Sequence, residues 1–191
     1  MIDLDFTLFE TAIGCCGIVW SGRGIAGVQI AEKSERATRK HIMRRYPGAH
    51  EIAPPPDVAR AIADIVALLN GEAKDLSYVA LNIDRVSDFN RRVYDVARTI
   101  RPGATLSYGE IAARLGDRNL ARDVAQALSQ NPFPLIVPCH RVLAAGGKIG
   151  GFSAPGGVRT KLRLLSIEGA RAGEPMLFDR LPWATADRRQ A

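Results

Sequence analysis

The sequence predicts an α/β (α+β) protein, in which a small unit of strands and helices precedes a mainly helical region that contains a helix-turn-helix. Two β-prone runs around a tight turn favour a sheet in the first half. Apolar residues at helical spacing favour helices, which dominate the second half. We place an N-terminal α/β domain at 1–86, a C-terminal domain at 87–169 and a tail at 170–191.

The N-terminal elements follow from turns and spacing. Residues 17–32 hold the two β-prone runs, typical of a hairpin, and 32–48 predict a polar surface helix. A second helix is predicted over 57–71, and 75–84 resemble a strand. The apolar face of the second helix would comprise Val58, Ile62, Ile65 and Leu69.

The C-terminal half predicts a run of helices. The first covers 87–103, and two short ones follow at 107–116 and 120–132. Ser107 and Glu110 have the spacing of a capping box. Two short helices joined by a glycine-containing turn form the helix-turn-helix pattern, which an ordinary helical hairpin shares at this level.

The remaining segments surround a cysteine. The apolar run 135–138 predicts a buried strand, and six glycines between 146 and 157 predict an irregular loop. A last helix is predicted from residue 158, and Gly169 follows it. Its inward face would comprise Val158, Leu162 and Leu165.

Size and cysteine content indicate the class of protein. At 191 residues the chain can bury a core without disulfides. Cys15, Cys16 and Cys139 are too few for a disulfide framework, which favours a reducing, cytoplasmic setting. No signal peptide pattern and no stretch of roughly 18 apolar residues is present, so we expect no membrane partner.

Positive charge is concentrated in the second half. Residues 1–100 carry 13 basic and 13 acidic side chains, whereas 101–168 carry nine basic and four acidic ones, a net of +5. Such a region suits a polyanion such as nucleic acid. A basic solvated surface explains the charge equally well.

Cys139 can be a packing residue, a metal ligand or a nucleophile. Metal ligation is disfavoured because the chain has no CxxC pair and no recognisable histidine spacing, so we expect no metal. A nucleophile needs a base, and His140 is adjacent. Neighbours on a strand point to opposite faces, so contact requires a turn, which Pro138 favours, or a bridging water. Glu168 is the nearby carboxylate that could orient the base.

Several motifs resemble one family. They are PCHRV with NPFP before it, SYGEIA and ARDVAQAL upstream, and GGFSAPGG and LLSIEG downstream. Together they resemble the methylated-DNA–protein-cysteine methyltransferases, or O6-alkylguanine-DNA alkyltransferases. The resemblance is strong over about 89–169, and it implies a ribonuclease H-like N-terminal unit.

The resemblance implies irreversible transfer of an alkyl group from O6-alkylguanine in double-stranded DNA to Cys139, by a monomer without a cofactor. O4-alkylthymine is a second candidate substrate. Glu168, His140 and a bridging water would deprotonate the thiol. Tyr108 would donate to the leaving guanine, and the loop at Ser153 would contact its O6 atom.

The resemblance also implies how DNA is held. Arg122 would enter the base stack in place of the flipped nucleotide. Asn131 would join the recognition helix to the active site, and the backbone of Val142 would hold the base. Arg141, within the PCHR motif, is a further candidate for DNA or substrate binding.

Two departures from the family pattern concern the pocket and the recognition helix. Ala125 replaces a usual glycine, and Phe152 replaces a common tyrosine. Three alternatives remain: an alkyltransferase-like protein that binds lesions without transfer, a cysteine hydrolase and a helix-turn-helix regulator. The first is disfavoured because such relatives lack the reactive cysteine, and the last leaves the glycine-rich loop unexplained.

Overall fold

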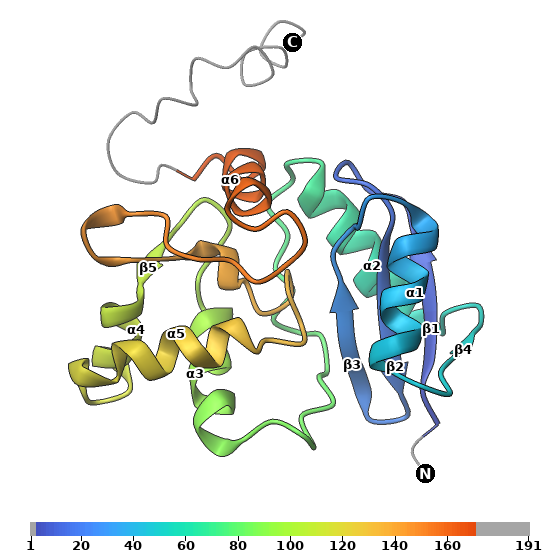
Figure 1. The fold of residues 1–191 in the computed structure, drawn as a ribbon, viewed down its shortest axis with the longest axis horizontal. Coiled ribbons are helices and arrows are strands. Elements are labelled where there is room, and N and C mark those ends of the chain that lie inside the picture. Colours follow the sequence, from blue (N-terminus) through green and yellow to red (C-terminus); the bar gives the residue numbers. More distant parts are fainter. Residues whose placement is uncertain (1–2, 171–191) are drawn as a thin grey trace, which may run out of the picture.

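The N-terminal half of the protein contains a four-stranded mixed sheet, in a computed structural model that describes residues 3–170 (Figure 1). The strand order is β3-β2-β1-β4; β1 is antiparallel to β2 and parallel to β4. The elements are β1 (Asp5–Phe9), β2 (Cys16–Ser21), β3 (Gly24–Gln29), α1 (Glu35–Arg45), β4 (His50–Glu51) and α2 (Pro56–Leu69).

The two helices cover opposite faces of the sheet (Figure 1). On β2, Val19 packs in a cluster with Ile42 of α1, whereas Ile18 and Trp20 belong to the cluster that contains Ile65 of α2. This alternation follows from the two-residue period of a strand. The hairpin of β2 and β3 and the helices α1 and α2 confirm the prediction. The strands β1 and β4 were not predicted.

The predicted strand at 75–84 is wrong. Only one isolated bridge joins this segment to Ile25. The backbone N–H and side-chain hydroxyl of Ser77 both donate to the carboxylate of Asp75, which bends the chain. The Arg98 guanidinium donates a hydrogen bond to the backbone carbonyl of Ser77 at 2.6 Å. These side-chain bonds, two local and one from α3, take the place of a strand ladder around Ser77.

The second half is built from helices, as predicted. Ser107 caps α4 in the expected capping box with Glu110, and Gly116 ends the turn after it with φ +101°. The short helices α4 and α5 form the predicted helix-turn-helix pair. The elements are α3 (Asp88–Arg98), β5 (Leu106–Ser107), α4 (Tyr108–Arg114), α5 (Ala121–Ser129), β6 (Val142–Leu143) and α6 (Val158–Ile167).

The predicted buried strand at 135–138 is also wrong, although its burial is right. The segment is a buried turn, in which Leu135 has φ 76° and one isolated bridge joins Pro134 to Val137. Pro132, Pro134 and Pro138 lack the backbone N–H that a ladder needs.

Of the three residues predicted on the inward face of α6, Leu165 is buried, and Val158 and Leu162 are not. Val158 is 42% exposed, and Leu162 is only partly buried. Leu164 and Leu165 are buried, together with a lysine, Lys161. Lys161 can take an inward position because its Nζ has two carbonyl partners inside the protein.

One hydrophobic cluster joins the two halves. It runs from Ile18 and Val28 in the sheet through Val93 of α3 to Cys139. Arg163 of α6 also donates to the backbone carbonyl of Ala12 in the β1–β2 turn. Within the described residues, no helix has the length and apolar character needed to cross a membrane. The predicted tail lies, from residue 171, outside the described residues.

Candidate active site

Cys139 begins a 3₁₀ turn that covers Cys139–Arg141. Its backbone N–H donates to the carbonyl of Val137 at 2.8 Å, and the N–H of Arg141 donates to the carbonyl of Pro138 at 2.9 Å. The predicted turn is therefore present. Cys139 is 9% exposed and packs against the hydrophobic cluster.

The next two residues of this turn both bind Glu168. His140 Nε2 lies 2.9 Å from Glu168 Oε1. The Arg141 guanidinium donates Nε to Oε2 and Nη2 to Oε1, each at 2.8 Å. The three side chains are 1%, 6% and 3% exposed for His140, Arg141 and Glu168. The structure thus joins α6 to the turn through a buried, fully engaged carboxylate.

The ionisation states suit a base at His140. Burial by itself would raise the pKa of Glu168, but the bonds from His140 and Arg141 lower it to about 2. Burial lowers the pKa of His140 below its usual 6.5, against the opposing effect of Glu168. A neutral imidazole that donates Nε2–H to the carboxylate keeps a lone pair on Nδ1. His140 Nδ1 is buried and has no partner among the described residues.

The thiol has several groups that favour its charged form. Burial raises the pKa of Cys139, and the Asn131 side chain, the Lys161 charge and the backbone N–H groups of Cys139 and His140 oppose that rise. No hydrogen bond between the Cys139 sulfur and the imidazole is found within residues 3–170. The two side chains are close in the chain, but proton transfer between them needs a mediator.

Lys161 is a feature that sequence reasoning missed. It is fully buried, and its Nζ donates to the carbonyls of Val142 at 2.6 Å and Gly151 at 3.3 Å. It lies 6.0 Å from the ring centroid of Tyr108. Burial lowers its pKa to about 8. One feature of the sequence could have indicated this burial. Lys161 lies three residues before Leu164, within the apolar stripe of the helix.

Tyr108 and Ser153 lie on different elements, a helix and a loop. Tyr108 is the first residue of α4 and is half-buried; burial, followed by the effect of Cys139, raises the pKa of its hydroxyl. Ser153 is exposed in the glycine-rich loop, and its hydroxyl donates to the carbonyl of Ser129 at the end of α5 at 2.9 Å. The loop is thereby tied to α5, the second helix of the predicted helix-turn-helix.

Asn131 and Val142 hold the backbone around the cysteine. Asn131 donates Nδ2 to the carbonyl of Val137 at 2.8 Å and accepts from the N–H of Phe133 at 2.9 Å. It links the end of α5 to the turn before Cys139. Val142 pairs with Leu106 in the parallel β5–β6 bridge.

The two arginine candidates differ in position. Arg122 is exposed in the first turn of α5, where a surface contact is open to it. Arg141 is 5% exposed, and its guanidinium is engaged by Glu168. An interior arginine with a bidentate partner does not face a ligand surface, so Arg141 differs from the expectation of a binding residue.

A cavity of about 160 Å³ opens at the cysteine. Its lining includes Cys139, Pro134, Phe152 and Ser153 from the second half. The N-terminal half contributes residues from β3 and α1 to the same lining. Phe152, one of the departures from the family pattern, thus forms part of this wall.

Known proteins resemble this chain over most of its length. The family model described as 6-O-methylguanine DNA methyltransferase, DNA binding domain, matches residues 88–170. A methylated-DNA–protein-cysteine methyltransferase of Methanothermobacter thermautotrophicus is 36% identical over 153 residues, or 80% of this chain and 78% of that protein. The protein of the same name from Mycobacterium tuberculosis is 33% identical over 177 residues, or 92% of this chain and 99% of that one.

Solved structures agree with this similarity. The crystal structure of the Mycobacterium tuberculosis O6-methylguanine methyltransferase has a TM-score of 0.69 at 32% identity and covers 90% of this chain and 96% of its own. A structure of the Mycobacterium tuberculosis protein in complex with DNA has a TM-score of 0.67 at 30% identity, with 88% and 96% covered. This chain therefore belongs to the O6-methylguanine DNA methyltransferase family.

Proposed function

We propose that Cys139 is the single-use alkyl acceptor of a DNA repair methyltransferase that acts on O6-alkylguanine in double-stranded DNA. The observation that carries this assignment is the buried series Cys139, His140 and Glu168, in which burial lowers the pKa of His140 and its Nδ1 has no partner within residues 3–170. Family membership supplies the reaction, and this geometry supports the residues. O4-alkylthymine is a second candidate substrate.

The reaction forms one bond and breaks one. The Cys139 thiol loses its proton through a water to His140, whose positive charge Glu168 stabilises. The thiolate attacks the alkyl carbon in line, the S–C bond forms and the C–O6 bond breaks. The guanine leaves with the electron pair, and the Tyr108 hydroxyl donates a hydrogen bond to its developing negative charge. The proton taken from Cys139 stays on His140 and balances that charge. The thioether has no easy route of hydrolysis, so each molecule acts once.

Lys161 and Arg141 act through other groups. Lys161 favours the thiolate electrostatically and fixes the carbonyls of Val142 and Gly151 beside the site. Arg141 orients Glu168 rather than DNA. Both are positioning residues.

DNA binding is assigned to the helix-turn-helix and the basic second half. We assign Arg122, on the exposed first turn of α5, to fill the stack after base flipping. Asn131, Ser153 and the backbone of Val142 would hold the flipped base. The protein would act as a monomer in the cytoplasm, a compartment in line with three free cysteines. We also propose that the boundary between the N-terminal and C-terminal domains lies between residues 86 and 87.

Peptide mass analysis tests the assignment. After incubation with a duplex that contains O6-methylguanine, the peptide with Cys139 should gain one methyl group, in proportion to the lesion repaired. Cys139→Ser should gain none, whereas Cys16→Ser should behave like the parent protein. Lesion binding without a methylated peptide would instead favour the alkyltransferase-like alternative.

A further inference from the structure

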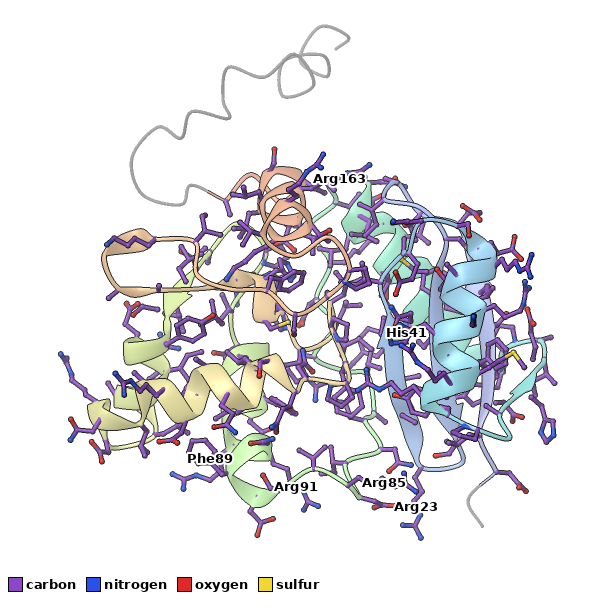
Figure 2. All side chains as sticks on the ribbon, viewed as in Figure 1. Arg23, His41, Arg85, Phe89, Arg91 and Arg163 are labelled. Atoms are coloured by element: carbon purple, nitrogen blue, oxygen red, sulfur yellow. The ribbon has the colours of Figure 1, made fainter. Side chains whose placement is uncertain are left out.

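The end of α5 that leads to the acceptor is held by α3. The two helices pack against each other, and Figure 2 shows Phe89, in the first turn of α3, just below α5 in that view. Asn90 of α3 donates its side-chain amide to the side-chain oxygen of Gln130 at 3.4 Å. One helical turn later, the hydroxyl of Tyr94 donates to the backbone carbonyl of Ala127 at 3.0 Å.

The bond from Tyr94 serves a carbonyl that α5 leaves partly unsatisfied. Ala127 is among the last four residues of the helix, whose carbonyls have no regular intrahelical partner. The N–H of Asn131, four residues on, donates to Leu128 instead, and the N–H of Gln130 reaches the Ala127 carbonyl at 3.2 Å. Tyr94 is 3% exposed and Ala127 is 1% exposed, so no solvent can replace the hydroxyl there.

The ring of Tyr94 contacts the segment that leads to the acceptor. It packs edge-to-face on Phe133, with 6.4 Å between the ring centroids. Asn131 accepts from the N–H of Phe133 and donates to the carbonyl of Val137, which also accepts from the N–H of Cys139. Burial, followed by the negative charge of Cys139, raises the pKa of Tyr94 to about 12. One buried side chain therefore joins α5 to the surroundings of the thiol.

We propose that Tyr94 is a positioning residue for alkyl transfer from duplex DNA. Its hydroxyl fixes α5 relative to the turn that carries Cys139, so that a base flipped out beside α5 meets the thiol in line. The inference rests on the proposed function. In-line attack tolerates little displacement of the reacting atoms. A free base enters the cavity without being placed by α5, and its reaction does not need this bond.

The substitution Tyr94→Phe removes the hydroxyl and keeps the ring that packs on Phe133. With O6-methylguanine duplex at a saturating concentration, the single-turnover rate should fall about fivefold, the effect of one hydrogen bond on an activation barrier. The rate with free O6-benzylguanine should not change. The Kd for the duplex should also stay the same, because a buried residue leaves the DNA-contacting surface intact.

Tyr46→Phe is the matched control. The Tyr46 hydroxyl also donates to a backbone carbonyl, that of Ala26, at 3.1 Å, but it lies in the N-terminal half. Loss of one such bond should lower the Tm of either variant by about 2–4 °C, so the two proteins are compared at similar stability. Tyr46→Phe should keep the ratio of the duplex rate to the free-base rate.

Hydrogen exchange of the folded proteins gives a second readout. The amide of Gln130 should exchange faster in Tyr94→Phe than in the parent protein or in Tyr46→Phe. An unchanged rate ratio in Tyr94→Phe would overturn the positioning role. So would equal losses on the duplex and the free base, or a weaker Kd with an unchanged rate at saturation. Failure of methyl transfer in the parent protein would instead overturn the proposed function.

Discussion

Two buried cysteines of this protein lie in opposite surroundings. Cys16 begins β2 and is fully buried; burial raises its thiol pKa. The Thr11 hydroxyl opposes this rise, and the negative charge of Glu10 adds to it. Its setting is that of a packing residue.

Cys139 is almost as buried, but the charge near it is the cation of Lys161, where Cys16 has the negative charge of Glu10. Burial again raises the thiol pKa, but an amide from Asn131, the cation of Lys161 and backbone N–H groups all oppose the rise. His140, whose pKa is lowered by burial, follows it in the chain. The comparison teaches that the sign of the nearby charge and the presence of a base distinguish the two thiols, since exposure does not.

The substitution Glu168→Gln should have the largest effect on the surroundings that distinguish Cys139 from Cys16. The change leaves the buried guanidinium of Arg141 without its charged partner, so the free energy of unfolding should fall by about 3–5 kcal/mol. Loss of the group that stabilises the His140 cation should slow methyl transfer about 100-fold or more. Urea unfolding and single-turnover rates measure the two effects.

Glu10→Gln is the matched change beside Cys16 and should alter neither quantity. Acid adds a second readout. Because the pKa of Glu168 is lowered from 4.5 to about 2, its contribution is present above pH 4.5 and lost as pH falls toward 2. That contribution is about 3 kcal/mol. An acid transition unchanged in Glu168→Gln would contradict it.

Lys161→Met should have the next largest effect. Without the cation the thiol pKa rises further, and transfer at pH 7 should fall about 10- to 100-fold. Raising the pH ionises the thiol and should increase the transfer rate of the parent protein. The increase should be smaller than thiol ionisation alone predicts, because Lys161 loses its charge near its pKa of about 8. The pH–rate profile measures this, and the effect should vanish in the variant.

The same lysine affects stability in the opposite direction. Its folded pKa lies below the ordinary 10.5, so between about pH 8 and 10.5 the unfolded chain holds a proton that the folded chain lacks. The contribution of this residue to stability therefore rises with pH in that window. Arg159→Met, an exposed change on α6, is the control and should move neither profile. A rate loss without any change in profile would leave Lys161 a purely structural role.

Arg122→Ala should have the smallest effect, because the residue lies on the surface and leaves the thiol environment intact. Transfer from an O6-methylguanine duplex should fall about tenfold, since flipping the base is no longer assisted. Reaction with free O6-benzylguanine should be unchanged. Arg114→Ala, an exposed arginine on α4, provides the control. Equal losses on the duplex and the free base would remove Arg122 from base flipping.

Local signals predicted much of the second half. The capping box of Ser107 and Glu110 placed the start of α4, and glycine turns marked the helix ends. Pro138 correctly indicated a turn at Cys139. These features depend on bonds within a few residues, so the order of the amino acids suffices to predict them.

The missed segments have different causes. Residues 75–84 look like a strand, but the guanidinium of Arg98, 21 residues along the chain from Ser77, donates to the carbonyl of Ser77. Residues 135–138 also look like a strand, but three prolines in or beside them lack the N–H that a ladder needs. The parallel partner of β1 is a two-residue strand some 45 positions away. Nothing local marks such pairings.

The sequence by itself determined the helices, the turn at Cys139 and, through its motifs, the chemistry expected there. Only the tertiary structure brought Glu168 into contact with Arg141 and with His140, which lies 28 residues earlier in the chain. It also buried Lys161 near the thiol. It alone brought Arg45 of α1 to the cavity at Cys139. The physical reason is that burial and charge pairing depend on distances in space, which the spacing of residues along a chain does not specify.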